Sequence, residues 1–313
     1  MKERVTENKI VLIVRRTRLD ELIVRFNTAE QARFYVEHLG ADFSDYLTED
    51  SRYKYAVGEA ERILSRLGRL QVIDRAFVPN FIFGGKDTVV VLGQDGLVAN
   101  VLKYLDGQLV IGVNPDPARW EGVLLPFSVS DLGRIVPEVF AGKRRIRAVT
   151  MAQATLNTGQ TLHGVNDIFI GPRSHISARY TIRIGERAES QSSSGVIVST
   201  GLGSTGWLRS ILAGARGIVS SVSGRRVKIN DELSFGWESD YLYFSVREPW
   251  PSKTSGADIT FGMITADTPL TIVSQMPENG IIFSDGIESD CLEFNSGTVA
   301  TISLAEKKGY LVT

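Results

Sequence analysis

The stretch Thr88-Val-Val-Val-Leu92-Gly93-Gln94-Asp95-Gly96-Leu97 joins a short apolar run to two glycines and one carboxylate. The apolar run predicts a strand that is buried on both faces. The glycines let the backbone turn sharply, and a helix expected from about residue 96 to 105 would offer free N–H groups to a phosphate. An Asp in this turn repels phosphate, so it is either an ordinary helix cap or the partner of a metal ion or a sugar hydroxyl.

Short apolar strands alternate with helices on both sides of this stretch. One helix is marked by an apolar stripe from Tyr53 to Leu67, and Gly68 follows where such a helix should end. The alternation predicts an α/β domain with an open, mainly parallel sheet over residues 1–128, whose ligands bind at the carboxyl ends of the strands. The expected strands are 10–14, 72–75, 88–92 and 109–113, and the expected helices are 28–39, 53–67, 96–105 and 129–141.

The pattern changes from about residue 144 to short strands with alternating polar and apolar residues. Runs at 179–184, 241–246, 259–264 and 270–273 predict an all-β C-terminal domain over residues 129–295, with one helix after Gly203. The segment 190–194, Ser-Gln-Ser-Ser-Ser, is expected to be a loop. A last segment, 296–313, completes the chain.

Composition excludes several classes of protein. A net charge of −1 over 313 residues lacks the basic excess of nucleic-acid-binding proteins. No apolar run approaches the length of a membrane span, and residues 1–9 lack the apolar core of a signal peptide. Cys291 is the only cysteine, and three histidines give little support for a zinc site. We therefore expect a cytoplasmic protein with no nucleic-acid or membrane partner.

Three further motifs follow or precede expected strands. Gly112-Val-Asn114-Pro-Asp-Pro117 ends the strand after the first motif, so the two loops would outline a crevice. Asn166-Asp167 stands before an apolar run and is either a simple turn or a pair of ligand-binding side chains. Asp285-Gly286 is the kind of dipeptide that forms a hairpin turn.

A fourth motif, Ser199-Thr-Gly-Leu-Gly203-Ser204-Thr205-Gly206, offers hydroxyls and bare amides to a nucleotide. It also matches Gly-x-Gly-x-x-Gly, the fingerprint of dinucleotide-binding dehydrogenases. That fingerprint needs a carboxylate about 20 positions on, at the end of the next parallel strand. Residues 219–229 contain none, and the neighbouring strands have the pattern of antiparallel ones.

Taken in order, the motifs at 93–96, 112–114, 166–167, 199–205 and 285–286 resemble those of the NAD kinases. The mitochondrial-type branch is the most similar, over the segments 112–119, 169–171, 177–180, 191–195 and 244–249. The resemblance implies phosphorylation of the 2′-hydroxyl of NAD's adenosine ribose by ATP with Mg²⁺, which gives NADP. It also implies a homodimer or higher homo-oligomer and a final segment that packs back on the first domain.

The resemblance assigns a role to each motif. Asp95 is expected to be the catalytic carboxylate, no metal ligand comes directly from the protein, and the ATP phosphates are bound at Gly93, Gln94 and Gly96. The NAD-binding residues are expected to be Asn114, Asn166, Asp167, Ser199, Thr200, Gly203, Ser204 and Thr205.

The chain departs from the family pattern at four positions. Gln94 replaces a glycine, Leu97 and Leu202 each replace a threonine, and Asp167 replaces a glutamate. The first two changes leave open a catalytically weak or silent NAD(P)-binding member of the family. A related lipid kinase would need an exposed apolar acceptor groove, whereas the Asn166-Asp167 pair suits a nucleoside.

Overall fold

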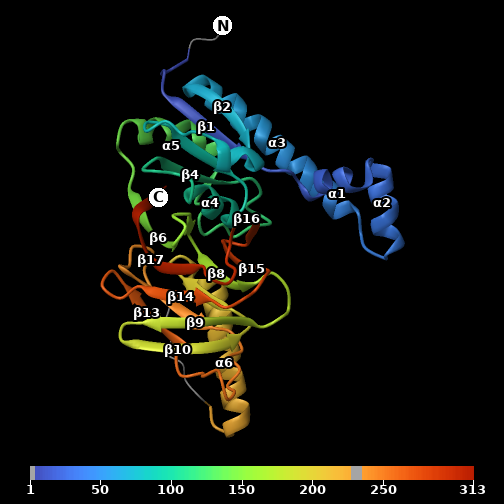
Figure 1. Ribbon diagram of the computed structural model, residues 1–313. Helices are drawn as coiled ribbons and strands as arrows, with labels where there is room; N and C mark the ends of the chain where they lie inside the picture. The colour runs from blue at the N-terminus through green and yellow to red at the C-terminus, as the bar shows by residue number, and fades with distance from the viewer. Residues whose placement is uncertain (1–3, 227–234) are drawn as a thin grey trace. The chain divides into compact units, whose positions relative to one another are not determined.

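The computed structural model describes residues 4–226 and 235–313, which form two compact units (Figure 1). The first unit contains the chain up to Arg147 together with Tyr310–Thr313. The second unit is Ala148–Gly309. The last strand, β17 (Val299–Val312), begins in the second unit and ends in the first, so each unit contains part of it.

The first unit has a sheet in which every described pairing is parallel. Its order is β2 (Arg69–Asp74), β1 (Lys9–Val14), β3 (Thr88–Leu92) and β4 (Leu109–Asn114). Beyond β4 lie β5 (Phe127–Ser128) and the end of β17. All five residues of β3 are buried, as expected for a strand covered on both faces. Since β2 and β3 flank β1 on opposite sides, the topological switch point lies between β1 and β3.

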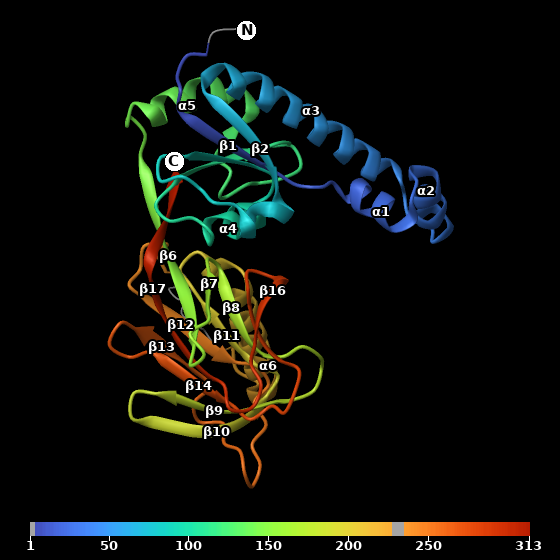
Figure 2. The same ribbon diagram turned by 45° about the horizontal axis from the view of Figure 1, so that its top comes forward.

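Helices cover both faces of this sheet. The long helix α3 (Ser44–Leu67) and α5 (Leu132–Phe140) pack on one face, and α4 (Asp95–Leu102) lies on the other (Figure 2). The predicted apolar stripe is the buried side of α3, which ends at Gly68. A side chain at Gly68 would place its Cβ 2.4 Å from the Asn8 carbonyl oxygen, so this end of the helix requires glycine.

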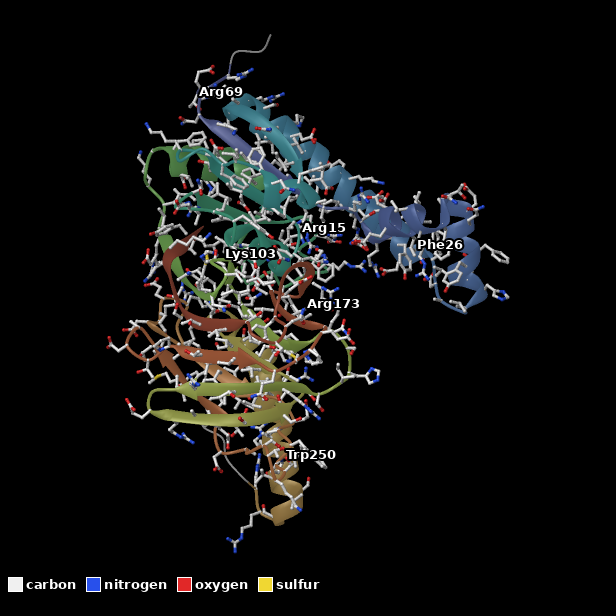
Figure 3. The ribbon with its side chains drawn as sticks, in the orientation of Figure 1. Arg15, Phe26, Arg69, Lys103, Arg173 and Trp250 are labelled. Carbon is white, nitrogen blue, oxygen red and sulfur yellow. The ribbon has the colours of Figure 1, made fainter. Side chains whose placement is uncertain are left out.

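Two short helices precede α3 in the chain and lie beside its N-terminal half. They are α1 (Arg18–Phe26) and α2 (Ala29–His38), which pack together around a small apolar cluster (Figure 3, where Phe26 is labelled). Thr28 caps α2, because its side chain accepts a hydrogen bond from the Gln31 N–H. Helix α3 begins well before its apolar stripe, because its first half packs on the α1–α2 cluster through Tyr46 and makes ion pairs from Glu49 to Arg15 and Arg18.

In its described residues, the second unit contains antiparallel strands, a short 3-10 turn (Gly203–Thr205) and one α-helix. One of its two sheets has the order β13, β12, β11, β8, β15, β16, and the other contains β10, β9, β14 and the first part of β17. Side chains from both sheets share one apolar core, and β6, which also pairs with β17, forms a hairpin with β7. The strands are β6 (Ile146–Leu156), β7 (Thr161–Gly164), β8 (Asp167–Pro172), β9 (Ala178–Ile184), β10 (Arg187–Ser193), β11 (Val196–Ser199), β12 (Tyr241–Val246), β13 (Phe261–Thr265), β14 (Leu270–Ser274), β15 (Gly280–Ser284) and β16 (Ile287–Glu293). The expected helix after Gly203 is α6 (Trp207–Ser223).

The expectation of a loop over residues 190–194 is wrong. These residues belong mainly to β10, which pairs with β9 over its whole length. Two of the polar side chains that favoured a loop are buried and bonded: the Tyr180 hydroxyl donates to Gln191 Oε1 at 3.1 Å and shares a 2.7 Å hydrogen bond with Ser193 Oγ. A satisfied polar network thus replaces the apolar alternation on which the prediction relied.

Within residues 4–226 and 235–313, no helix combines the length and apolar content needed to cross a membrane.

Candidate active site

The glycine-rich turn begins directly after β3. A Cβ at Gly93 would lie 2.7 Å from a methyl group of Leu97, so Leu97 closes the back of the turn and would have to move to admit a side chain there. Gln94 is the cap residue of α4 with φ −114° and ψ 163°, an extended conformation that any residue adopts without strain. The backbone N–H groups of residues 94–96 have no partner in the part of the chain that the structure describes. The turn therefore keeps the free amides that can bind phosphate oxygens.

Asp95 is the first residue of α4 and is half-buried. Its carboxylate accepts hydrogen bonds from the backbone N–H of Leu124 at 2.7 Å and of Val123 at 3.2 Å. A negative charge is favourable at a helix N-terminus. The carboxylate is thus held in a fixed orientation at the carboxyl end of the parallel sheet. These two donors could not be predicted, because residues 120–125 carry no recognisable motif.

The loop between β4 and β5 (residues 115–126, the β4–β5 loop) supplies both donors. Asn114 shapes it: the side-chain Nδ2 donates to the Trp120 carbonyl at 2.8 Å, and Oδ1 accepts from the Asp116 N–H at 3.0 Å. At Gly112 a Cβ would lie 1.9 Å from the Leu124 carbonyl oxygen, so the loop packs directly on β4. Both polar ends of Asn114 are therefore already used within the loop that orients Asp95.

Ion pairs tie the β4–β5 loop to α3. Arg119 makes two hydrogen bonds to the Asp45 carboxylate, at 2.8 and 2.7 Å, and Arg52 binds Asp116 at 2.9 Å. The hydrogen bonds from Arg119, followed by that from Arg18, hold the pKa of Asp45 well below its usual range. These contacts are exposed, so their main effect is on the position of the loop rather than on stability.

A second group of predicted residues gathers in the second unit, around the start of β8. The Asp285 carboxylate accepts from the backbone N–H groups of Val165 at 3.0 Å, Asn166 at 2.6 Å and Asp167 at 3.3 Å. Asp285 and Gly286 both have positive φ, 54° and 72°, and form the expected two-residue hairpin turn between β15 and β16. The hairpin was predictable from the sequence, but the use of its carboxylate to shape the Asn166-Asp167 turn was not.

The side chains of Asn166 and Asp167 remain available to a ligand. No hydrogen bond joins either side chain to the residues that the structure describes. Asp167 is only 9% exposed, and burial, followed by repulsion from Asp285, raises its pKa to about 7. A buried carboxyl group without a partner is costly unless a ligand or a proton satisfies it.

The glycine turn after β11 packs against the same backbone. The Thr200 hydroxyl donates to the Val165 carbonyl at 2.5 Å and accepts from the Gly203 N–H at 3.2 Å. At Gly203 a Cβ would lie 1.9 Å from the Asn166 carbonyl oxygen. The structure therefore brings the motifs at 166–167, 199–205 and 285–286 together.

The hydroxyl groups of this turn are not equally available. Ser199 and Ser204 are buried, and each donates to a backbone carbonyl, of Thr200 and Gly201 respectively. Thr205 is exposed and has no side-chain hydrogen bond within the described residues. Both neighbours of β11 are antiparallel, which contradicts the parallel βαβ unit that a dehydrogenase fingerprint requires.

Among the described residues, no group of three or more His, Cys, Asp or Glu side chains is arranged to hold a metal ion. A doubly wound sheet with a glycine-rich turn near its switch point is the arrangement that binds nucleotides in open α/β proteins. Here it is joined to an antiparallel β unit with its own cluster of polar motifs.

Comparison with known proteins shows which nucleotide-binding proteins the chain resembles. No protein-family model matches the chain. The NAD kinase of Chlorobaculum tepidum is 28% identical over 124 residues, which span 39% of this chain and 43% of that relative. Two solved structures are similar over nearly the whole chain. An Archaeoglobus fulgidus NAD kinase in complex with ATP has a TM-score of 0.58, 14% identity and coverage of 97% of this chain and 93% of its own. Yeast NADH kinase complexed with NADH has a TM-score of 0.59, 16% identity and coverage of 99% and 84%. The chain has the fold of the NAD kinases.

Proposed function

We propose that the protein is an NAD kinase, which transfers the terminal phosphoryl group of ATP to the 2′-hydroxyl of the adenosine ribose of NAD. The observation that carries the proposal is the Asp95 carboxylate, fixed by two amides beside a phosphate-binding turn in a chain with this fold. The 28% identical segment of the bacterial NAD kinase supports it.

In the proposed reaction, Mg–ATP is the donor substrate. The free amides of residues 94–96 bind its phosphate oxygens, and Gly93 lets the backbone approach them. The 2′-oxygen of NAD attacks the terminal phosphorus, ADP leaves with the electrons of the broken P–O bond, and the hydroxyl proton passes to Asp95. Positioning and charge stabilisation provide most of the rate enhancement in such transfers.

The second group of residues binds the adenosine part of NAD in this proposal. Asn166 offers an amide and Asp167 a carboxyl group, neither of which has a partner in the described chain. Thr205 offers an exposed hydroxyl, whereas Ser199, Thr200, Gly203 and Ser204 shape the turn from within. Asn114 acts through the β4–β5 loop that orients Asp95. Since Asp167 is one methylene shorter than the usual glutamate, a bridging water is expected in its contact with NAD.

The mitochondrial-type branch is also proposed. Four of the five segments that carry this likeness lie in the second unit, and three of them meet there: Tyr180 binds Gln191 and Ser193, and the backbone of Arg247 pairs with Ser194 and Gly195. Contacts between these segments support the proposal, because segments that distinguish one branch are expected to form one structural feature. The cytoplasmic location remains part of the proposal, with which the free thiol of Cys291 is consistent.

A homodimer or higher homo-oligomer is proposed as well. Helix α6 exposes Ile218 at 68%, Val219 at 48% and Val222 at 84% of their surface, which is unusual for a helix without an apolar partner. Light scattering on the purified protein measures the oligomer, and a monomer at all concentrations would contradict this part.

One assay tests the activity. Purified protein is incubated with NAD, ATP and Mg²⁺, and NADP is detected by a coupled dehydrogenase. Asp95→Asn should lower turnover by roughly 10²- to 10⁴-fold, because the general base is lost. Asp106→Asn, an exposed position shortly after α4, is the matched control and should behave as wild type. Wild-type protein that binds NAD in a calorimeter yet forms no NADP would instead identify a silent NAD(P)-binding member of the fold.

A further inference from the structure

The side chain of Tyr53, on α3, lies between the ends of β1 and β3. Its hydroxyl accepts a hydrogen bond from the Arg15 N–H and donates one to the Leu92 carbonyl, both at 2.9 Å. The β1–β3 pairing runs from Ile10 to Ile13 on β1, and the residues bonded to the hydroxyl lie beyond its end. The hydroxyl thus takes the place of the next backbone hydrogen bond between the two strands and holds their ends apart.

These two strand ends are the topological switch point of the sheet, where the strand order reverses. β2 lies on one side of β1 and β3 on the other, and in open parallel sheets the crevice at such a point binds the ligand. Leu92 is also the residue directly before Gly93. The bond to its carbonyl therefore fixes the residue from which the turn toward Asp95 starts.

The clamp is rigid. Tyr53 is only 4% exposed, and the Arg15 guanidinium lies 4.9 Å from its ring centroid (Figure 3, where Arg15 is labelled). Arg15 in turn binds Glu49, one turn earlier on α3, at 2.8 Å. Burial raises the pKa of Tyr53 to about 12, so the hydroxyl keeps the proton that it donates to Leu92 at neutral pH.

We propose that Tyr53 is a positioning residue for the phosphoryl transfer: through the Leu92 carbonyl it sets the place of residues 93–96 and hence of Asp95. The inference rests on the proposed function. Tyr53 contacts no reacting atom in this scheme. Without its hydroxyl, the Arg15 N–H and the Leu92 carbonyl lose their buried partner or bond to each other, and either outcome displaces the turn.

The test is Tyr53→Phe, which removes one oxygen atom from a buried ring. The kcat for NADP formation should fall about ten- to a hundred-fold, because a displacement of about 1 Å at a reacting group has effects of this size. The Kd of NAD should not change, since its proposed ligands lie in the other unit. Tyr55→Phe is the matched control, because Tyr55 is on the same helix but 73% exposed, and it should behave as wild type.

Hydrogen–deuterium exchange gives a readout that does not depend on activity. In Tyr53→Phe, the amides of residues 94–97 should exchange faster, whereas those of Val89–Val91 inside the sheet should not change. 4-Aminophenylalanine at position 53, whose amino group can donate and accept, should recover most of kcat even if the phenylalanine variant folds poorly.

Two outcomes would overturn the inference. One is a Tyr53→Phe variant with wild-type kcat and wild-type exchange at residues 94–97. The other is faster exchange spread over the whole first unit with a lower thermal midpoint, which indicates a purely structural role. Failure of the proposed function can be told apart from both outcomes, because wild-type protein would then form no NADP. The exchange comparison alone would then decide whether Tyr53 positions residues 94–97.

Discussion

Replacement of Asp167 by Asn should make the protein more stable, and increasingly so as the pH rises. The Asp167 carboxyl is 9% exposed, has no hydrogen-bond partner among the described residues and has a pKa raised from 3.8 to about 7. Burial is the main cause and the Asp285 charge the second. The folded chain therefore binds this proton more tightly than the unfolded chain does.

The size of the effect follows from the pKa shift. A carboxyl group with a raised folded pKa stabilises the fold only while it is protonated, and this contribution is lost as the pH rises from about 4 to about 7. A shift of about three pKa units at about 1.4 kcal/mol each gives a penalty on the order of 4 kcal/mol above pH 7. Asparagine resembles the protonated carboxyl and cannot ionise, so the variant escapes the penalty.

The measurement is the free energy of unfolding of wild type and Asp167→Asn in urea, at about pH 4.5 and about pH 8. Three of the four tryptophans, Trp207, Trp237 and Trp250, lie in the second unit, so tryptophan fluorescence reports mainly on that unit. The advantage of the variant should be small at the lower pH and reach a few kcal/mol at the higher one. Asp240→Asn, an exposed position of the same unit, should show no such trend. An advantage that does not change with pH would refute the reasoning.

Two more variants probe the same region. Asp285→Asn keeps a residue type that tolerates positive φ but removes the charge, so the pKa of Asp167 should fall, as carboxyl carbon NMR can measure; an unchanged pKa would show that Asp285 does not act on Asp167 electrostatically. Gly203→Ala should lower the free energy of unfolding by about 2 kcal/mol or more, because its Cβ meets the Asn166 carbonyl, whereas Gly214→Ala in open space on α6 should raise it by up to about 1 kcal/mol. Equal effects of the two glycine variants would contradict the close packing seen at Gly203.

The parallel sheet was predictable because most of its strands have a recognisable local sequence pattern. Thr88–Leu92 and the strands on either side of it, β1 and β4, are buried on both faces, so each is a largely apolar run. The edge strand β2 is mostly exposed and is less apolar. Helix α1 was not predicted, although the sequence encodes it. Leu19, Leu22, Ile23 and Phe26 recur at three- and four-residue steps and pack into one apolar cluster. The start of the helix is encoded as well, since Thr17 and Asp20 form a capping box.

The site was predictable as a set of motifs, but not in its supporting contacts. The free amides near Asp95 follow from a strand, a glycine turn and a helix in sequence order. The partners of Asp95 and the three amides bound by Asp285 come from distant parts of the chain, in the latter case about 120 residues away. Long-range pairs of this kind leave no local pattern. The strand β10 was missed for the same reason, because its polar side chains bond to Tyr180 on another strand.

The path of β17 has a practical consequence for dissecting the molecule. Its last residues, Tyr310 and Leu311, pair in parallel with Leu109 and Val110 of β4, and Thr313 donates its N–H to the Arg145 carbonyl. The first unit therefore cannot be expressed whole as one uninterrupted segment. Cutting after Arg147 leaves the start of β4, at Leu109 and Val110, with an unpaired edge that favours aggregation. A synthetic peptide of the final residues should restore this edge by binding in trans.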